Sequence, residues 1–146
     1  MAFSSDGSKL IAGQDYLSYQ ILTSADSGAT WTARIGPLHW PCVASSADGT
    51  KLAATDSAGQ IHTSTDSGVT WTPRESTRVW VGITSSADGT KLAAVVSGGQ
   101  IYLSTDSGVT WTATGPNQSW ASIASSADGR KLVAVVNGGQ IYTFSY

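Results

Sequence analysis

An eight-residue stretch that occurs three times, 40 residues apart, is the strongest constraint on how this chain can fold. The copies from Ser64 to Trp71 and from Ser104 to Trp111 are identical, and the copy from Ser24 to Trp31 differs from them at two positions. An internal repeat of this length indicates a repeat architecture in which each unit is one supersecondary element.

The chemistry of this stretch predicts a tight turn between two strands. Asp-Ser-Gly offers a carboxylate to the backbone N–H groups of its own turn and a glycine that adopts positive φ without strain. The tryptophan that follows can pack beneath the turn. The pattern Ser-x-Asp-x-Gly-x-Thr-Trp resembles the Asp-box (BNR) repeat of sialidases and of non-enzymatic bacterial β-propellers. In that family the box is a structural turn, and the resemblance implies this role for Ser24, Asp26, Gly28, Trp31, Ser64, Asp66, Gly68, Trp71, Ser104, Asp106, Gly108 and Trp111.

Aligning the Asp-Gly and Gln-Ile pairs divides the chain, as a single repeat domain, into four units. These units cover about 2–39, 40–79, 80–119 and a shortened 120–146. In the third unit we expect strands over 80–85, 91–96, 100–105 and 109–114, joined by tight turns. Four short antiparallel strands in about 40 residues are typical of a β-propeller blade. The first unit carries two additional residues, in the stretch from Gly13 to Tyr19.

The sequence therefore predicts an all-β propeller with nearly four blades per chain. The last unit has no Asp box and no fourth strand, so we expect no strand exchange within the chain to close the ring. Exposed apolar blade faces are unfavourable in water. The simplest remedy is closure by oligomerisation, as a homodimer that forms an eight-bladed ring, and a monomeric four-bladed ring is the alternative.

The charges exclude several classes of partner. Only 12% of the residues are charged and the net charge is −2. The lysines recur at one position of the repeat and form no basic stripe, so no nucleic-acid partner is expected.

No apolar run approaches the roughly 20 residues that a membrane-spanning helix needs, so we expect no membrane insertion. The start of the chain does not read as a signal peptide, and the charge-poor composition with the family resemblance weakly favours an extracellular or extracytoplasmic location. His39 and His62 lack a metal-ligand spacing, so neither a metal nor a cofactor is expected.

The loops that connect the units differ from one another while the turns agree, which points to the loops as the functional face. Each loop ends in a tryptophan, and an indole can stack on a sugar ring while repetition adds avidity; the same tryptophans could instead form the core between blades. Three glutamines, Gln60, Gln100 and Gln140, open third strands near these loops and could contact a ligand or a neighbouring loop. The candidate carbohydrate-binding residues are Trp40, Trp80, Trp120, Gln60, Gln100, His39, Arg34, Arg78, Asn117 and Gln118.

Two functions fit these residues. The first is a carbohydrate-binding, lectin-like propeller that binds a glycan through repeated sites on the loop face. The alternative is a non-catalytic protein-binding or assembly scaffold whose loops contact a surface protein, since Arg74-Glu75 and Asn117-Gln118 could hardly recognise the same ligand. Sialidase activity is not expected: the resemblance implies that it needs an arginine cluster, a Tyr-Glu pair and an acid/base aspartate, and the only glutamate is Glu75. A glycosidase that uses paired carboxylates needs two acids in one cleft, and most aspartates lie in the repeated turns. We therefore expect a protein that is not an enzyme.

Overall fold

The computed structural model describes residues 1–14, 19–57 and 59–145. Most of the expected enlargement of the first unit falls on residues 15–18, outside the described residues. The described chain forms strands and turns, with no helix that is long and apolar enough to cross a membrane. The strands are β1 (Ala2–Phe3), β2 (Leu10–Gly13), β3 (Ile21–Ser24), β4 (Thr32–Ile35), β5 (Cys42–Ser45), β6 (Leu52–Thr55), β7 (Ile61–Ser64), β8 (Thr72–Arg74), β9 (Trp80–Ser85), β10 (Leu92–Ser104), β11 (Thr112–Ser125), β12 (Lys131–Val136) and β13 (Ile141–Ser145).

The strands form antiparallel meanders that follow the sequence repeat. The first sheet has the order β1-β2-β3-β4 and the second the order β5-β6-β7-β8, while the remaining strands form one sheet of order β13-β12-β11-β10-β9. We call β1–β4 blade 1 and β5–β8 blade 2. Blade 3 comprises β9, β10 and the first part of β11, and blade 4 comprises the rest of β11 with β12 and β13.

The last two blades share one sheet because β10 and β11 are long. Residues 92–96 of β10 pair with β9, and residues 101–103 pair with the start of β11. The far end of β11, from Trp120 to Ser125, pairs with β12. β10 thus covers the positions that β6 and β7 hold in blade 2. The fourth strand begins at Thr112 and not at Val109 as expected, because the residues between Asp106 and Thr110 are held in the turn.

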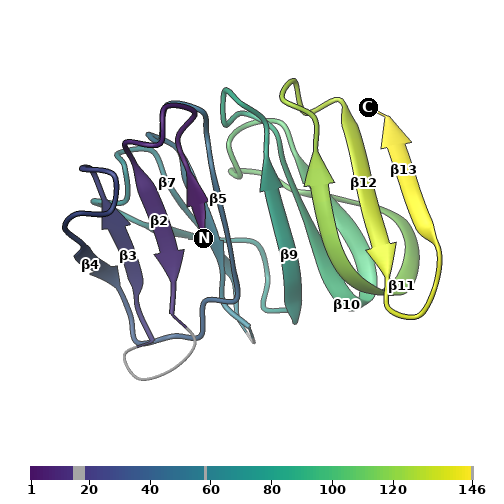
Figure 1. Cartoon of the computed structure of the whole chain (residues 1–146). Coiled ribbons are helices and arrows are strands. Elements are labelled where there is room, and N and C mark those ends of the chain that lie inside the picture. The colour runs from purple at the N-terminus through teal and green to yellow at the C-terminus, as the bar shows by residue number, and fades with distance from the viewer. Residues whose placement is uncertain (15–18, 58, 146) are drawn as a thin grey trace.

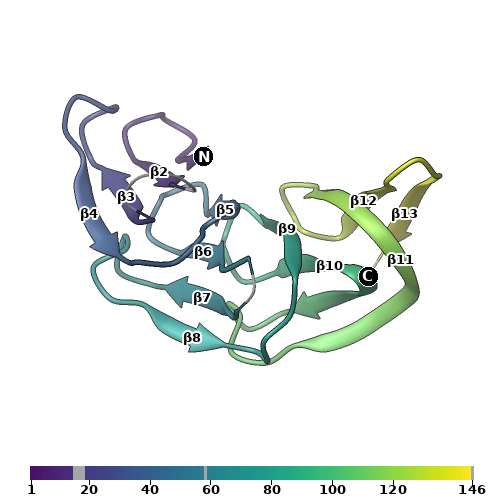
Figure 2. The same ribbon diagram turned by 90° about the horizontal axis from the view of Figure 1, so that it is seen from below.

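The blades pack side by side around one axis, with their first strands innermost (Figure 2). β5 packs against β1, β2 and β9, and β9 packs against β11. Each junction has a core centred on one tryptophan: Trp40 between blades 1 and 2, Trp80 between blades 2 and 3, and Trp120 between blades 3 and 4. The described strands of blades 1 and 4 show no comparable packing against each other, so the chain is an open arc and not the closed four-bladed ring of the alternative. Closure of the ring by a second copy of the chain stays a prediction, because the structure contains one chain.

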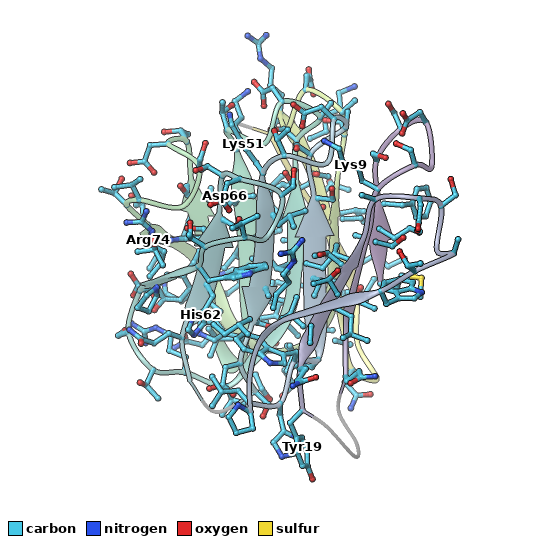
Figure 3. All side chains as sticks on the ribbon, turned by 90° about the vertical axis from the view of Figure 1, so that its left-hand side faces the viewer. Lys9, Tyr19, Lys51, His62, Asp66 and Arg74 are labelled. Atoms are coloured by element: carbon cyan, nitrogen blue, oxygen red, sulfur yellow. The ribbon has the colours of Figure 1, made fainter. Side chains whose placement is uncertain are left out.

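The two ends of the blades differ in character (Figure 1). One end, which we call the turn face, carries the Asp-Gly turns and the Asp-Ser-Gly turns. The opposite end, the loop face, carries the hairpins between second and third strands and the connections between blades. Figure 3 shows Lys9 and Lys51 at the turn face and Tyr19 at the loop face.

Candidate functional site

Every residue of the repeated motif contributes to its turn. In blade 2 the Ser64 hydroxyl donates to Asp66 Oδ1 at 2.8 Å and accepts from the Gly68 amide at 2.9 Å. The same carboxylate accepts from the Thr70 amide at 2.8 Å, and the Trp71 indole donates to the Gly68 carbonyl at 3.0 Å. The turns at Asp26 and Asp106 repeat this network. The motif is therefore fully occupied by its own hydrogen bonds.

These hydrogen bonds stabilise the charged carboxylate. Bonds from the Thr70 hydroxyl and amide, and then from Ser64, lower the pKa of Asp66 to about 2. The Asp-Gly turns behave in the same way: the Ser46 hydroxyl and the Thr50 amide lower the pKa of Asp48 to about 2. An aspartate held in this ionised state is poorly suited to act as a general acid.

The three tryptophans predicted to stack on sugars lie in the core instead. Trp40 and Trp80 are 1% exposed and Trp120 is 3% exposed. Each makes an edge-on ring contact within its junction, with His62, Tyr102 and Tyr142 respectively, at centroid distances of 5.1 to 5.2 Å. The indoles have no open face for a ligand, so the stacking role predicted for them is corrected to that of junction core, which the sequence had left open.

The hydrogen bonds of these indoles are also internal. Trp80 Nε1 donates to the Gly59 carbonyl at 3.1 Å and Trp120 Nε1 to the Gly99 carbonyl at 2.9 Å. Trp40 Nε1 has no such partner among the described residues. The carbonyls that accept from Trp80 and Trp120 lie in the hairpins between second and third strands, and the equivalent hairpin of blade 1 has two additional residues.

The predicted glutamines brace the connections between blades. Gln60 and Gln100 donate their amides to the carbonyls of Glu75 and Gly115, at 2.8 and 3.0 Å. Gln118 donates to the Tyr142 hydroxyl at 3.3 Å, and Asn117 beside it is exposed.

The charged candidates of the loop face lie apart from one another. Arg78 Cζ lies 4.6 Å from the ring centroid of Tyr102, and Arg78 Nη2 lies 3.6 Å from Glu75 Oε1. The exposed His39 ring contacts Tyr19 at a centroid distance of 4.5 Å. The structure therefore brings the loop-face candidates into separate blade junctions and not into one common site.

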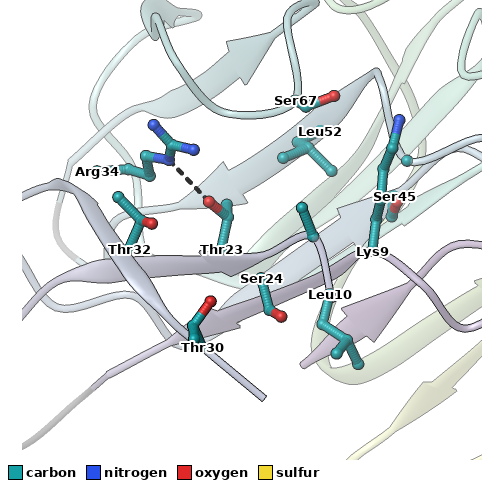
Figure 4. Close-up of a pocket in the computed structure, with 12 residues that line it drawn as sticks. Lys9, Leu10, Thr23, Ser24, Thr30, Thr32, Arg34, Ser45, Leu52 and Ser67 are labelled. Atoms are coloured by element: carbon teal, nitrogen blue, oxygen red, sulfur yellow. Dashed lines mark hydrogen bonds between the residues drawn. The ribbon is translucent and has the colours of Figure 1, made fainter. Parts of the chain in front are cut away.

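Arg34 belongs to a pocket at the junction of blades 1 and 2, on the side of the turn face (Figure 4). The pocket has a volume of about 220 Å³. Its lining includes two apolar side chains, Leu10 and Leu52, and two cationic ones, Lys9 and Arg34. Arg34 Nε donates to Thr23 Oγ1 at 2.7 Å, which fixes the guanidinium over the pocket. The hydroxyl groups of the lining come from Thr23, Ser24, Thr30, Thr32, Ser45 and Ser67.

The same arginine–threonine pair recurs in blade 2, where Arg74 Nε donates to Thr63 Oγ1 at 3.1 Å. In blade 3 the corresponding residues are Leu103 and Thr114, so the pair is absent from the third junction. Sequence reasoning identified Arg34 but placed it on the loop face and missed Lys9, Thr23 and the serines. A threonine eleven residues before an arginine in two units was the signal that could have found the pair.

Among the described residues, no group of three or more His, Cys, Asp or Glu side chains could hold a metal ion. Seven aspartates lie in the repeated turns, one to a turn, and the lining of the blade 1–blade 2 pocket contains neither aspartate nor glutamate.

The sequence matches no protein-family model and no curated protein. Its fold is similar to solved structures. A Niastella koreensis GH74 enzyme aligns with a TM-score of 0.73 and 25% identity, over 97% of this chain and 22% of that one. YCF48 bound to D1 peptide aligns with a TM-score of 0.63 and 17% identity, over 97% of this chain and 63% of that one. Kuenenia stuttgartiensis hydrazine synthase aligns with a TM-score of 0.82 and 16% identity, over 99% of this chain and 44% of that one.

The chain therefore spans less than two thirds of each of these structures. The neighbours are β-propeller proteins and include both an enzyme and a peptide complex. Together with the antiparallel blades described above, they show that this chain has the β-propeller fold.

Proposed function

We propose that this chain is a carbohydrate-binding propeller of the Asp-box type, and that its sugar sites are the pockets between blades, not the loop-face tryptophans. The observation that carries the proposal is the arginine held by a threonine hydroxyl in the hydroxyl-lined pocket between blades 1 and 2. The hydroxyls of Ser24 and Thr30 are held by Asp26, but those of Thr32 and Ser67 and the guanidinium are suitable partners for the hydroxyls of a sugar, and the two leucines can contact its apolar edge.

The size and charge of the pocket narrow the ligand. A volume of about 220 Å³ is below the usual range for drug-sized ligands and suits a single sugar ring. Lys9 and Arg34 line the pocket, and the lining contains no carboxylate, although the Lys9 ammonium also donates to the Asp48 carbonyl at 3.0 Å. This combination favours a sugar that carries a carboxylate or sulfate group, because an arginine can bind such a group through two hydrogen bonds.

We propose a role in binding and not in hydrolysis. The GH74 neighbour is an enzyme, but this chain spans only 22% of its length. A paired-carboxylate hydrolase requires two acids that face one bond, and the pocket lining supplies none. The aspartates nearest the pocket, such as Asp26, are bonded to their own turns.

A glycan array that compares neutral with acidic sugars tests this proposal, followed by titration of any hit by calorimetry. We expect acidic sugars to bind, and we expect the double variant Arg34→Met/Arg74→Met to weaken binding at least tenfold while the protein stays folded. The matched control is Arg130→Met, which removes an exposed arginine beside an Asp-Gly turn. A hit that survives the double variant unchanged would contradict the assignment of the sites.

A protein-binding scaffold is the second candidate, and the similarity to YCF48 bound to D1 peptide favours it. In this case the exposed residues of the loop face, which differ between blades, would form the contact surface. A folded protein that binds no glycan on the array favours this function over the first. Loss of peptide or protein binding on Arg78→Ala or Asn117→Ala would then locate the surface.

A further inference from the structure

Neighbouring blades are joined by a ladder of identical contacts along the turn face. The amide of Ser5 donates to the carbonyl of Ala47, the amide of Ala47 to that of Ala87, and the amide of Ala87 to that of Ala127, each at 2.7 Å. One backbone hydrogen bond between equivalent residues thus crosses every junction, always from the earlier blade to the later one.

A lysine crosses each junction in the same direction. The ammonium groups of Lys9, Lys51 and Lys91 donate to the backbone carbonyls of Asp48, Asp88 and Asp128, at 3.0, 2.9 and 2.8 Å. The stem of each lysine lies against the glycine of the next Asp-Gly turn. A Cβ added at Gly49, Gly89 or Gly129 would lie 2.8 to 2.9 Å from the lysine Cβ, too close for any side chain there.

Blade 4 carries the donor half of this junction without an acceptor. Ala127 N–H and the Lys131 ammonium have no equivalent partner among the described residues. One residue in the second strand of each blade faces the next blade. In blades 1 to 3 this residue is Ile11, Ala53 or Ala93 and is at most 1% exposed, whereas in blade 4 it is Val133, which is 39% exposed. A hollow of about 340 Å³ opens here, lined by Lys131, Val133 and Thr143 among others.

Blade 1 carries the acceptor half. Among the described residues, no backbone N–H donates to the Ser5 carbonyl outside the strand pairing, and none apart from the chain neighbours of Gly7 has an atom within 4 Å of a Cβ placed at Gly7. Trp31 is 38% exposed, whereas its equivalents Trp71 and Trp111 pack against the junction cores before them. The free face of blade 1 therefore has the shape and the hydrogen-bonding groups of the later side of every internal junction.

We propose that blade 4 of one copy of this chain docks on blade 1 of a second copy and forms there the same junction as between the blades within the chain. Ala127 N–H then donates to the Ser5 carbonyl of the second copy, and the Lys131 ammonium to the Asp6 carbonyl, with the Lys131 stem against Gly7. A head-to-tail contact gives a ring when its repeated rotation closes and an open filament when it does not, and we propose that two such junctions close a ring of two chains. The proposal does not depend on carbohydrate binding.

Light scattering after size-exclusion chromatography tests this on the 146-residue chain. The wild type is expected to have the mass of two chains at micromolar concentration. Gly7→Asn is expected to have the mass of one chain, since a side chain at this position collides with the lysine stem of the partner. Asparagine tolerates the positive φ of 71° at Gly7, so the circular dichroism spectrum is expected to stay that of the wild type.

Gly98→Asn is the matched control. Gly98 has a φ of 70° and also nothing within 4 Å of a Cβ, but it lies on the hairpin within blade 3. This variant is expected to stay dimeric. A second pair, Lys131→Glu and its exposed neighbour Arg130→Glu, gives the same comparison if Gly7→Asn fails to fold. Three results would each overturn the proposal: a wild type with the mass of one chain, a dimer that persists in both Gly7→Asn and Lys131→Glu, or growth into open-ended oligomers.

Discussion

Each turn of the turn face is organised by one aspartate whose carboxylate accepts bonds from the hydroxyls and amides around it. These bonds lower the pKa of Asp6, Asp26, Asp48, Asp66 and Asp106 to about 2 and also lower the pKa values of Asp88 and Asp128. The sequence was sufficient to predict these turns because the interactions are local: donor and acceptor lie two to four residues apart. The carboxylates are exposed, so each contributes little alone, and the effect comes from their number.

The lowered pKa values predict the acid stability of the protein. A carboxyl group with a pKa of 3.8 when unfolded and about 2 when folded stabilises the fold above pH 3.8, and this contribution is lost as the pH falls toward 2. Burial lowers the pKa of His62 below 6.5, so the unfolded state gains a proton first and a smaller loss begins below pH 6.5. Melting temperatures measured from pH 8 to pH 2 are therefore expected to show a small decrease once the pH is below 6.5 and a steep decrease once the pH is below 4.

The variant His62→Tyr is the control for the upper step, since tyrosine occupies this position in blades 3 and 4. It is expected to remove the loss below pH 6.5 and leave the loss below pH 4. A melting temperature that stays constant down to pH 2 would contradict the role of the aspartates.

At the scale of strands and blades, the sequence predicted the elements better than their contacts. The repeat placed the strands within a few residues, since apolar runs such as Leu92 to Val96 and turn residues mark their limits. It could not decide whether Trp80 was exposed, because a residue at the start of a strand next to a loop can point into the junction or out of it. Arg34 was likewise recognised as a candidate but assigned to the wrong end of the blade, because its partner Thr23 is fixed by strand pairing and not by proximity in sequence.

The burial of Trp80 predicts a large loss of stability on truncation. Trp80→Ala removes a side chain that is 1% exposed, together with its hydrogen bond to the Gly59 carbonyl. We expect the free energy of unfolding to fall by about 3–5 kcal/mol, measured by urea denaturation. Trp31 is a motif tryptophan that is 38% exposed, so Trp31→Ala is expected to lower the free energy of unfolding clearly less. A Trp80→Ala protein of unchanged stability with weakened sugar binding would restore the stacking role and contradict the core assignment.

For the molecule as a whole, identical junctions imply stability that depends on neighbours. In repeat proteins the stability is approximately the sum of the stabilities of the units and of the interfaces between them. The sequence predicted this stacking through its 40-residue period. It could not show which groups cross each junction, because the lysine and the carbonyl that it contacts are 37 to 39 residues apart.

A lysine within the arc and a lysine at its end should therefore affect stability in different ways. Lys51→Met removes the bond to the Asp88 carbonyl but keeps an apolar stem against Gly89, so we expect it to lower stability by about 1 kcal/mol at every protein concentration. Lys131→Met acts only at the seam between copies. Association stabilises the folded state by mass action, so the melting temperature of a dimer rises with protein concentration. Calorimetry over a hundredfold range of concentration is expected to show this rise in the wild type and in Lys51→Met, and a much weaker rise in Lys131→Met. If the two variants gave the same dependence, the terminal lysine would have no part in joining the copies, and the ladder would be a feature of single chains alone.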